Sequence, residues 1–131
     1  MFLFATLAGC EAEPGAAAEP EFALRAAMFQ VENYKRLIEP QLRNPDRMPE
    51  VERQLADMLP WIDDPAFDRW IDRPIFQGDP ERFLGWRYDM KQAAVAAREA
   101  ASAANLDGLR DAFIRMNTTC IACHKRYQPN Y

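Results

Sequence analysis

The last twelve residues read Cys120-Ile121-Ala122-Cys123-His124-Lys125-Arg126-Tyr127-Gln128-Pro129-Asn130-Tyr131. Cys-x-x-Cys-His is the attachment signature of c-type haem. Each of the two thiols adds across one haem vinyl group, and two intervening residues separate the sulfurs by about one helical turn. His124 is the only histidine in the chain, and a neutral imidazole suits an axial position on the iron. The motif therefore predicts one covalent haem c held by Cys120, Cys123 and His124.

Two other chemistries use a Cys-x-x-Cys pair. A thioredoxin-like redox pair stands early in a strand–helix unit, whereas this pair stands at the end of a helical pattern with no strand before it. A structural zinc site takes four ligands, usually from two such pairs, and the only other cysteine here is the distant Cys10. We therefore expect haem rather than a dithiol or a zinc site.

The composition is that of one soluble domain. The 131 residues are 49% hydrophobic and 27% charged, and a chain of this length can bury a sizeable core. The net charge is -4 and the basic residues are dispersed, so we expect no nucleic-acid binding. No nucleophile–base pair or phosphate-binding loop is present, so we do not expect an enzyme.

The N-terminal segment contains a candidate targeting signal. A short apolar run is followed by Leu7-Ala8-Gly9-Cys10, which resembles a bacterial lipobox, in which the cysteine is lipidated. Lipidation of Cys10 would anchor the chain to a membrane as a lipoprotein in the periplasm, the compartment where haem c is attached. The basic region of a secretory signal is absent, so the alternative is a frayed apolar tail that carries a chance cysteine.

The expected domain organisation follows from these segments. Residues 1–10 are the signal or lipobox-like segment, and residues 11–20 form a flexible tether of Glu, Ala, Pro and Gly. Residues 21–131 form the folded domain. The apolar run in the first segment is too short to span a bilayer as it stands.

Four amphipathic helices are expected, because apolar residues recur at helical spacing and prolines bound the segments. Pro40 should stop the first helix and Pro60 the second, and Asn105 or Asp107 should cap the fourth. We expect helices at 21–39, 49–59, 80–104 and 105–127, a loop at 43–49, and a packed connection at 60–80 with one helical turn near 66–71. The fold class is thus all-α, an antiparallel four-helix bundle with the haem attachment motif on its last helix.

Alanines dominate the inner face of the third helix in its second half, which allows either close helix approach or room for a flat ligand. Together these features resemble the cytochrome c-prime family, the class II c-type cytochromes. The resemblance covers roughly residues 22–127, and its sharpest parts are Asn105-Leu106-Asp107-Gly108-Leu109-Arg110-Asp111-Ala112-Phe113, the Cys-x-x-Cys-His motif, Tyr127 and Leu59-Pro60-Trp61.

The resemblance implies that Cys120 and Cys123 hold the haem through thioethers and that His124 is the proximal ligand. Lys125 and Arg126 are then either near the haem propionates or part of a solvated terminal face. A first-helix arginine that meets a propionate in relatives corresponds to Arg25. The family also implies a homodimer paired through its first two helices and redox partner proteins in the cell envelope.

The distal side of the iron divides this family. In one branch a first-helix methionine supplies a thioether, which gives a low-spin iron suited to one-electron transfer. In the other branch an apolar residue blocks that side, and the iron binds nitric oxide or carbon monoxide. We expect Met28 to be the distal ligand, although a register one residue later would place Phe29 there, and core packing is the alternative role of Met28.

Three functions therefore remain open from the sequence. The first is an electron carrier with His124 and Met28 on the iron, and the second is a five-coordinate protein that binds small neutral gases. The third is a structural bundle whose Cys-x-x-Cys-His motif carries no haem. We favour the electron carrier.

Overall fold

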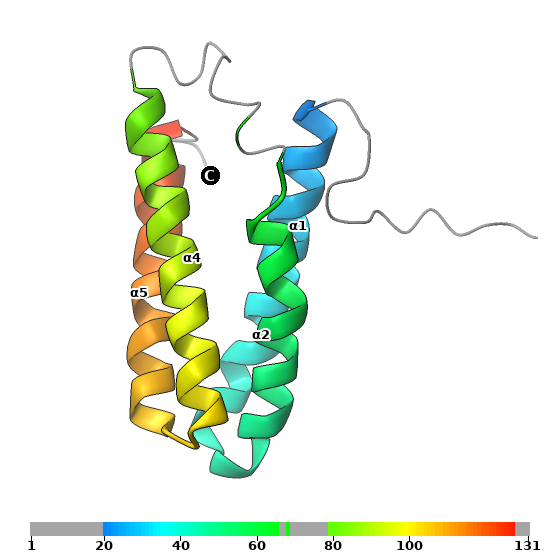
Figure 1. The fold of residues 1–131 in the computed structure, drawn as a ribbon, viewed down its shortest axis with the longest axis vertical. Coiled ribbons are helices and arrows are strands. Elements are labelled where there is room, and N and C mark those ends of the chain that lie inside the picture. Colours follow the sequence, from blue (N-terminus) through cyan, green and yellow to red (C-terminus); the bar gives the residue numbers. More distant parts are fainter. Residues whose placement is uncertain (1–19, 66–67, 69–78, 128–131) are drawn as a thin grey trace, which may run out of the picture.

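The chain folds into four long helices that pack together (Figure 1). The structure, a computed structural model, describes residues 20–65, 68 and 79–127. Within these residues there is no strand, and the prediction of an all-α fold is confirmed. The helices are α1 (Pro20–Ile38), α2 (Met48–Ile62), α4 (Pro80–Ser102) and α5 (Leu106–Tyr127), and two short 3-10 helices, η1 (Glu39–Arg43) and η2 (Pro45–Arg47), lie between α1 and α2.

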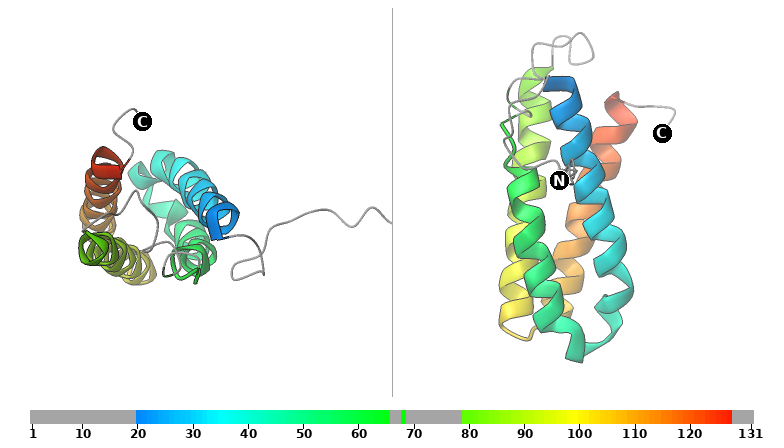
Figure 2. Two further views of the ribbon diagram at one scale, coloured as in Figure 1. Left: turned by 90° about the horizontal axis from the view of Figure 1, so that it is seen from above. Right: turned by 90° about the vertical axis from the view of Figure 1, so that its right-hand side faces the viewer.

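The connections from α1 to α2 and from α4 to α5 lie at the same end of the molecule. There η1 and η2 join α1 to α2, and a tight turn joins α4 to α5 (Figure 1). The most extensive contacts are made by α4 with α5, α2 with α4, and α1 with α2, while α1 and α5 are not among the closely packed pairs of the described chain. The view from above shows α1 and α2 as one pair and α4 and α5 as the other (Figure 2). The C-terminal half of α5 therefore lies far from these two connections, at the end where α4 begins.

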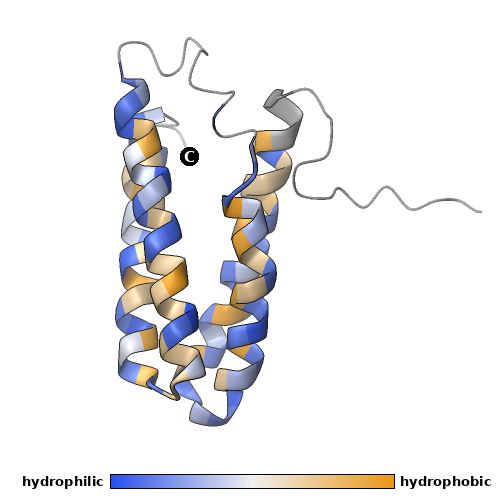
Figure 3. Cartoon of the chain, viewed as in Figure 1, coloured by the Kyte–Doolittle hydropathy of each residue, from blue (hydrophilic) through white to orange (hydrophobic). Residues whose placement is uncertain are grey.

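The core forms where the amphipathic faces meet, and hydrophobic positions gather on the sides of the helices that face one another (Figure 3). In α4 these positions are mostly alanine, and α4 makes its closest packing with α5. Small side chains at these positions permit close approach of α4 to its neighbouring helices. The bulky residues with almost no exposed surface are Ile38, Val51, Leu55, Met58, Ile62, Leu109 and Met116.

The expectation that Pro60 ends the second helix is wrong, because α2 continues to Ile62 with Pro60 inside it. Proline lacks the N–H that the helix ladder needs and crowds the preceding turn, yet the next turn still closes, since Asp63 N–H donates to the Leu59 carbonyl at 3.1 Å. Trp61 and Ile62 are buried, so their packing stabilises the additional turn.

Two cations of α4 also hold the C-terminal end of α2. The Arg87 Nε donates to the Ile62 carbonyl at 3.2 Å, and Lys91 forms an ion pair of 2.8 Å with Asp63. Positive charge at a helix C-terminus is favourable, because the last carbonyls give that end a partial negative charge.

The turn between α4 and α5 is built on shared residues. Helix α4 ends at Ser102, two residues earlier than expected, and Ala104 adopts a left-handed conformation with φ 54°. The Asn105 N–H then donates to the Ala100 carbonyl at 2.8 Å, a bond that closes a helix end of the Schellman type. The Asn105 side chain accepts a hydrogen bond from the Gly108 N–H at 2.9 Å, so of the two expected caps Asn105 begins α5.

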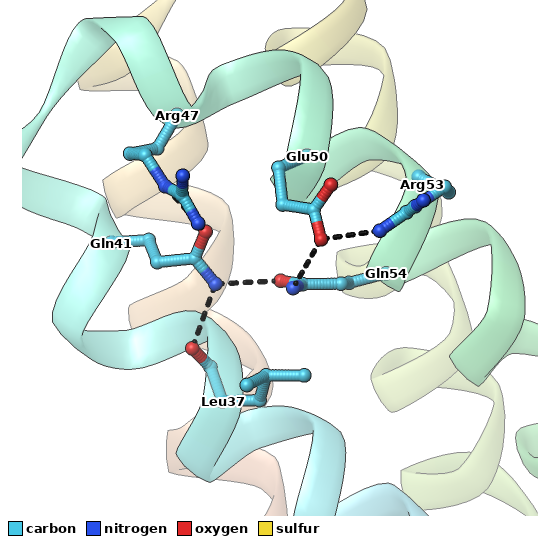
Figure 4. Close-up of polar contacts among 6 residues, drawn as sticks. All are labelled: Leu37, Gln41, Arg47, Glu50, Arg53 and Gln54. Atoms are coloured by element: carbon cyan, nitrogen blue, oxygen red, sulfur yellow. Dashed lines mark hydrogen bonds and ion pairs between the residues drawn. The ribbon is translucent and has the colours of Figure 1, made fainter.

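A polar network braces the connections between α1 and α2. The buried Gln54 accepts a hydrogen bond from Gln41 Nε2 at 2.8 Å and donates one to Glu50 Oε1 at 3.1 Å (Figure 4). Where a loop was expected, η1 and η2 therefore form an ordered crossing. Arg110 of α5 adds a long-range contact, because its Nε donates to the Leu42 carbonyl at 2.7 Å.

Several sequence predictions fall outside the described residues. These are the lipobox-like segment with Cys10, the tether before Pro20, and the helical turn near 66–71 except Asp68. Among the helices that the structure does describe, none combines the length and the apolar character needed to cross a membrane.

Candidate functional site

The Cys-x-x-Cys-His segment occupies the last two turns of α5 (Figure 1). Cys120, Cys123 and His124 are half-buried, and both cysteines pack against the core cluster. The Cys120 Sγ lies 3.8 Å from the Met90 Sδ of α4, so this thiol is directed towards the interior. Ile121, between the two cysteines, is 56% exposed and lies on the outer side of the helix. The segment thus has an inner, sulfur-bearing side and an outer, solvated one.

Burial keeps the two thiols protonated. Both are free, and desolvation is the main cause that raises the pKa of Cys120 and raises the pKa of Cys123 to about 11. Disulfide exchange and metal–thiolate binding use thiolates, which are favoured by exposed and electropositive surroundings that lower the pKa. The surroundings of these two thiols act in the opposite direction.

The surroundings of His124 favour its neutral form. Burial lowers its pKa, and the positive charge of Lys35 lowers it further, with Glu32 acting in the opposite sense. Lys35 and Glu32 also influence the pKa of Cys120. Because such influence requires proximity, the part of α1 that carries these two residues lies near the motif. A neutral imidazole keeps a lone pair that can bind a metal.

Met28 lies on the same flank of α1 as these charged residues. Its spacing of four residues from Glu32 and seven from Lys35 places all three along one side of the helix. Met28 is half-buried and packs against the core, whereas Phe29 is 65% exposed. Of the two residues that the sequence left open for the distal position, Met28 is therefore the one on the side of α1 that faces the motif.

The turn after His124 is anchored to the start of α4. The Tyr127 hydroxyl, on a buried ring, donates to the Asp79 backbone carbonyl at 3.2 Å and lies 3.3 Å from its Oδ2. The ring meets those of Phe83 and Trp86 edge-on, with centroids 6.0 and 5.9 Å away. These contacts fix the end of α5 within one turn of the motif histidine.

Asp79 is the site residue that sequence reasoning missed. It stands just before Pro80, where an aspartate is expected to cap a helix, but its side chain makes no capping hydrogen bond. Its carboxylate pairs instead with Arg126 at 3.2 Å and contacts Tyr127. The Asp-Pro pair signals a helix start and gives no indication of a partner 48 residues away.

The other residues that the sequence singled out are Arg126, Lys125 and Arg25. Arg126 pairs with Asp79, and Lys125 and Arg25 are exposed. Within the described chain, no three His, Cys, Asp or Glu side chains converge as a metal-binding group. A shallow surface depression lies where α2 meets α4 and includes no motif residue; it is lined by Ala56, Leu59, Pro60, Asp63, Asp64, Pro65 and Arg98.

Comparisons of the chain with protein-family models, curated proteins and solved structures gave no match. The resemblance to the cytochrome c-prime family is therefore carried by the residues of this chain alone.

Proposed function

We propose that this protein is a one-electron carrier of the bacterial cell envelope that holds one haem c. Cys120 and Cys123 would bind the haem through thioethers, with His124 as the proximal ligand and Met28 as the distal ligand. The helices would form the antiparallel four-helix bundle of the cytochrome c-prime family. Residues 21–131 would be the cytochrome domain, tethered by residues 11–20 to a lipidated Cys10 on the periplasmic side.

The observation that carries this proposal is the position of the motif. The attachment signature of haem stands on the last two turns of α5, with the Cys120 sulfur towards the core, and the charges of Glu32 and Lys35 on the Met28 flank of α1 act on Cys120 and His124. Free thiols can add to the haem vinyl groups, and a neutral imidazole is the form that binds iron. The residues present therefore fit a haem group.

The bound haem would supply a one-electron ferric–ferrous couple. The chain's own contribution is to hold and orient that group. His124 offers a lone pair from a helix that Tyr127 fixes against α4, and a thioether from Met28 would favour the ferrous state. Closure of the distal position by a protein ligand excludes exogenous molecules, so the iron would exchange electrons without binding a substrate.

A second function follows if Met28 remains in the core. Its side chain packs against the core cluster, and in that position it would cover the distal side without a bond to the iron. The protein would then be a five-coordinate cytochrome c-prime that binds nitric oxide or carbon monoxide. The two functions differ in a single bond, so one variant separates them.

The test is production of the chain in a bacterial host that attaches haem c, followed by mass and visible spectra. We expect a mass increase of one haem, sharp low-spin bands in both oxidation states, and no change with carbon monoxide. Met28→Ala should convert the spectrum to high-spin and make it respond to carbon monoxide. Met48→Ala, at the buried start of α2, is the matched control and should keep the low-spin bands.

Each alternative has its own result. A high-spin, carbon monoxide-sensitive spectrum of the unaltered protein would establish the gas-binding function. A colourless protein with the mass of its amino acids would leave a helical bundle without haem.

A further inference from the structure

Asp79 does not take the usual role of an aspartate at a helix start. It stands immediately before Pro80, at the position from which a side-chain oxygen commonly accepts a hydrogen bond from the first turn, but its side chain makes no such bond. The backbone closes this turn instead, since the Phe83 N–H donates to the Asp79 carbonyl at 3.4 Å. The carboxylate is therefore available for contacts with another helix.

The Asp79 carboxylate connects the start of α4 to the end of α5. Its Oδ1 pairs with Arg82 at 3.5 Å, and its Oδ2 pairs with Arg126 at 3.2 Å and lies 3.3 Å from the Tyr127 hydroxyl. The side chain is only 17% exposed, so water and salt screen these charges less than they screen a surface ion pair. Contacts to both oxygens hold the carboxylate in one orientation between the two helices.

Tyr127 links this anchor to the Cys-x-x-Cys-His motif. Its ring is buried and meets the Trp86 ring of α4 edge-on, with centroids 5.9 Å apart. A helical side chain leans towards the N-terminus of its helix, which places the Tyr127 ring over the turn that carries Cys123 and His124. The last carbonyls of a helix have no partner within that helix, so side-chain contacts are important for holding the turn in place.

We propose that Asp79 is a positioning residue for His124, and that it fixes, through Tyr127 and Arg126, the direction from which the imidazole meets the haem iron. This role rests on the proposed electron-carrier function. Metal-bound histidines are oriented by groups beyond the ligand itself, and the orientation of the imidazole plane affects the electronic structure of the iron. Loss of the carboxylate therefore changes the spectrum of the iron as well as the stability of the fold.

The test compares two aspartates in the ferric holoprotein by proton NMR, because the shifts of the haem-methyl resonances depend on the orientation of the axial ligands. Asp79→Ala should move these resonances or split them into several sets, since His124 is no longer held in one orientation. The control Asp63→Ala also removes a carboxylate that pairs with a cation of α4, in this case Lys91 at 2.8 Å, and should keep the parent resonances.

Two further measurements separate positioning from general stability. Asp79→Asn keeps a side-chain oxygen beside Tyr127 but removes the charge that pairs with Arg126, so it should displace the resonances less than Asp79→Ala does. Hydrogen exchange of the holoprotein should be about tenfold faster for the amides of residues 124–127 in Asp79→Ala than in the parent, with amides near Leu109 unchanged.

The possible failures are distinguishable. Unchanged haem-methyl resonances in haem-loaded Asp79→Ala would overturn the role of Asp79 and leave the electron-carrier function intact. Equal displacements in Asp79→Ala and Asp63→Ala would also overturn it, because they would reflect a general loosening of the helices. If Asp79→Ala does not retain haem, Asp79→Asn supplies the same comparison. A parent protein without haem would remove the electron-carrier function and this role together.

Discussion

The two ends of the helical assembly are held by different kinds of contact. At the connection end, which comprises η1, η2 and the turn between α4 and α5, Leu109 and Ile38 are fully buried and Arg110 bonds the Leu42 carbonyl. At the motif end, which comprises Cys120–Tyr127 and the start of α4, the described contacts of α5 are chiefly with α4, through Tyr127 and Asp79. The connection end therefore has fully buried apolar side chains, whereas the inner side of the motif end carries half-buried polar and sulfur groups.

This difference suggests a division of labour along α5. The N-terminal half of α5 packs in the core and stabilises the fold, whereas its C-terminal half carries the two thiols and the imidazole. Because the same helix does both, its register at one end sets the position of the thiols and the imidazole at the other. The following predictions test whether the two ends behave as differently as their contacts suggest.

Shortening a buried side chain at the connection end should have the largest effect on the free energy of unfolding. Leu109→Ala removes a fully buried side chain, and such substitutions cost about 3 to 4 kcal/mol of unfolding free energy, because a cavity remains. Ile114→Ala, on the exposed side of the same helix, should cost less than about 0.5 kcal/mol. Urea titration followed by circular dichroism measures both values. Similar losses for the two variants would contradict the core assigned to this end.

Backbone hydrogen exchange should distinguish the ends directly. In a haem-free variant, Cys120→Ser with Cys123→Ser, amides in the last two turns of α5 should exchange about 100-fold faster than amides near Leu109, since fewer buried contacts hold them. In the haem-loaded protein this ratio should fall to near one. Mass spectrometry of peptic fragments gives both ratios. Uniform protection along α5 in the haem-free variant would remove the distinction.

The thiols should report the burial of the motif. With its pKa raised from 9.0 to about 11, Cys123 in the folded haem-free chain has a thiolate fraction at pH 8 near 0.1%, against about 10% for an exposed thiol. Alkylation by iodoacetamide should then be about 100-fold slower than in the urea-unfolded chain, and its rate should keep rising up to about pH 11. Peptide mapping resolves Cys123 from Cys120. A rate that levels off near pH 9 would show an exposed thiol.

The anchor of the last turn should have a moderate effect. Tyr127→Phe keeps the ring packing against Phe83 and Trp86 but removes the hydroxyl that bonds Asp79, at a cost of about 1 kcal/mol. Thermal unfolding should shift by a few degrees, and exchange in the last turn should accelerate more than at Leu109. If Tyr127→Phe left the unfolding temperature and the exchange rates unchanged, ring packing alone would fix the end of α5.

The smallest expected effect is a gain in stability. Ala104→Gly should stabilise the protein by about 0.5 kcal/mol, because glycine relieves a left-handed conformation that costs alanine more than glycine loses in chain entropy. Chemical denaturation measures the change. Ala103→Gly, at the neighbouring position with φ -83°, should destabilise, so the sign of the pair tests the turn geometry.

Local signals in the sequence predicted most of the helical structure. Apolar spacing located α1, α4 and α5 within two residues, and the preference for Asn and Asp at helix starts left Asn105 and Asp107 as caps of α5, of which the structure has Asn105. The errors lie where tertiary contacts decide. Pro60 was expected to stop α2, but burial of Trp61 and Ile62, with Arg87 on the last carbonyls, outweighs one lost hydrogen bond.

The candidate site likewise combines residues that local sequence signals identified with residues that only tertiary contacts reveal. The motif is a contiguous signal, so Cys120, Cys123 and His124 could be named from sequence, although their haem remains a prediction. Met28 and Phe29 could not be separated by spacing alone, because adjacent residues differ only by rotation about the helix. The pairing of Asp79 with Tyr127, and the nearness of Lys35 to His124, join distant parts of the chain and have no local signature.

Asn105 ends α4 with its backbone and begins α5 with its side chain, so no residue of this turn is spare. Insertion or deletion of one residue there would rotate the whole of α5 by about 100° about its axis. Cys120 would then lose its contact with the Met90 sulfur, and the exposed side chains of Ile114 and Ile121 would turn by the same angle. The length of this turn thus sets the rotation of α5 about its axis, and through it the direction in which Cys120, Cys123 and His124 point.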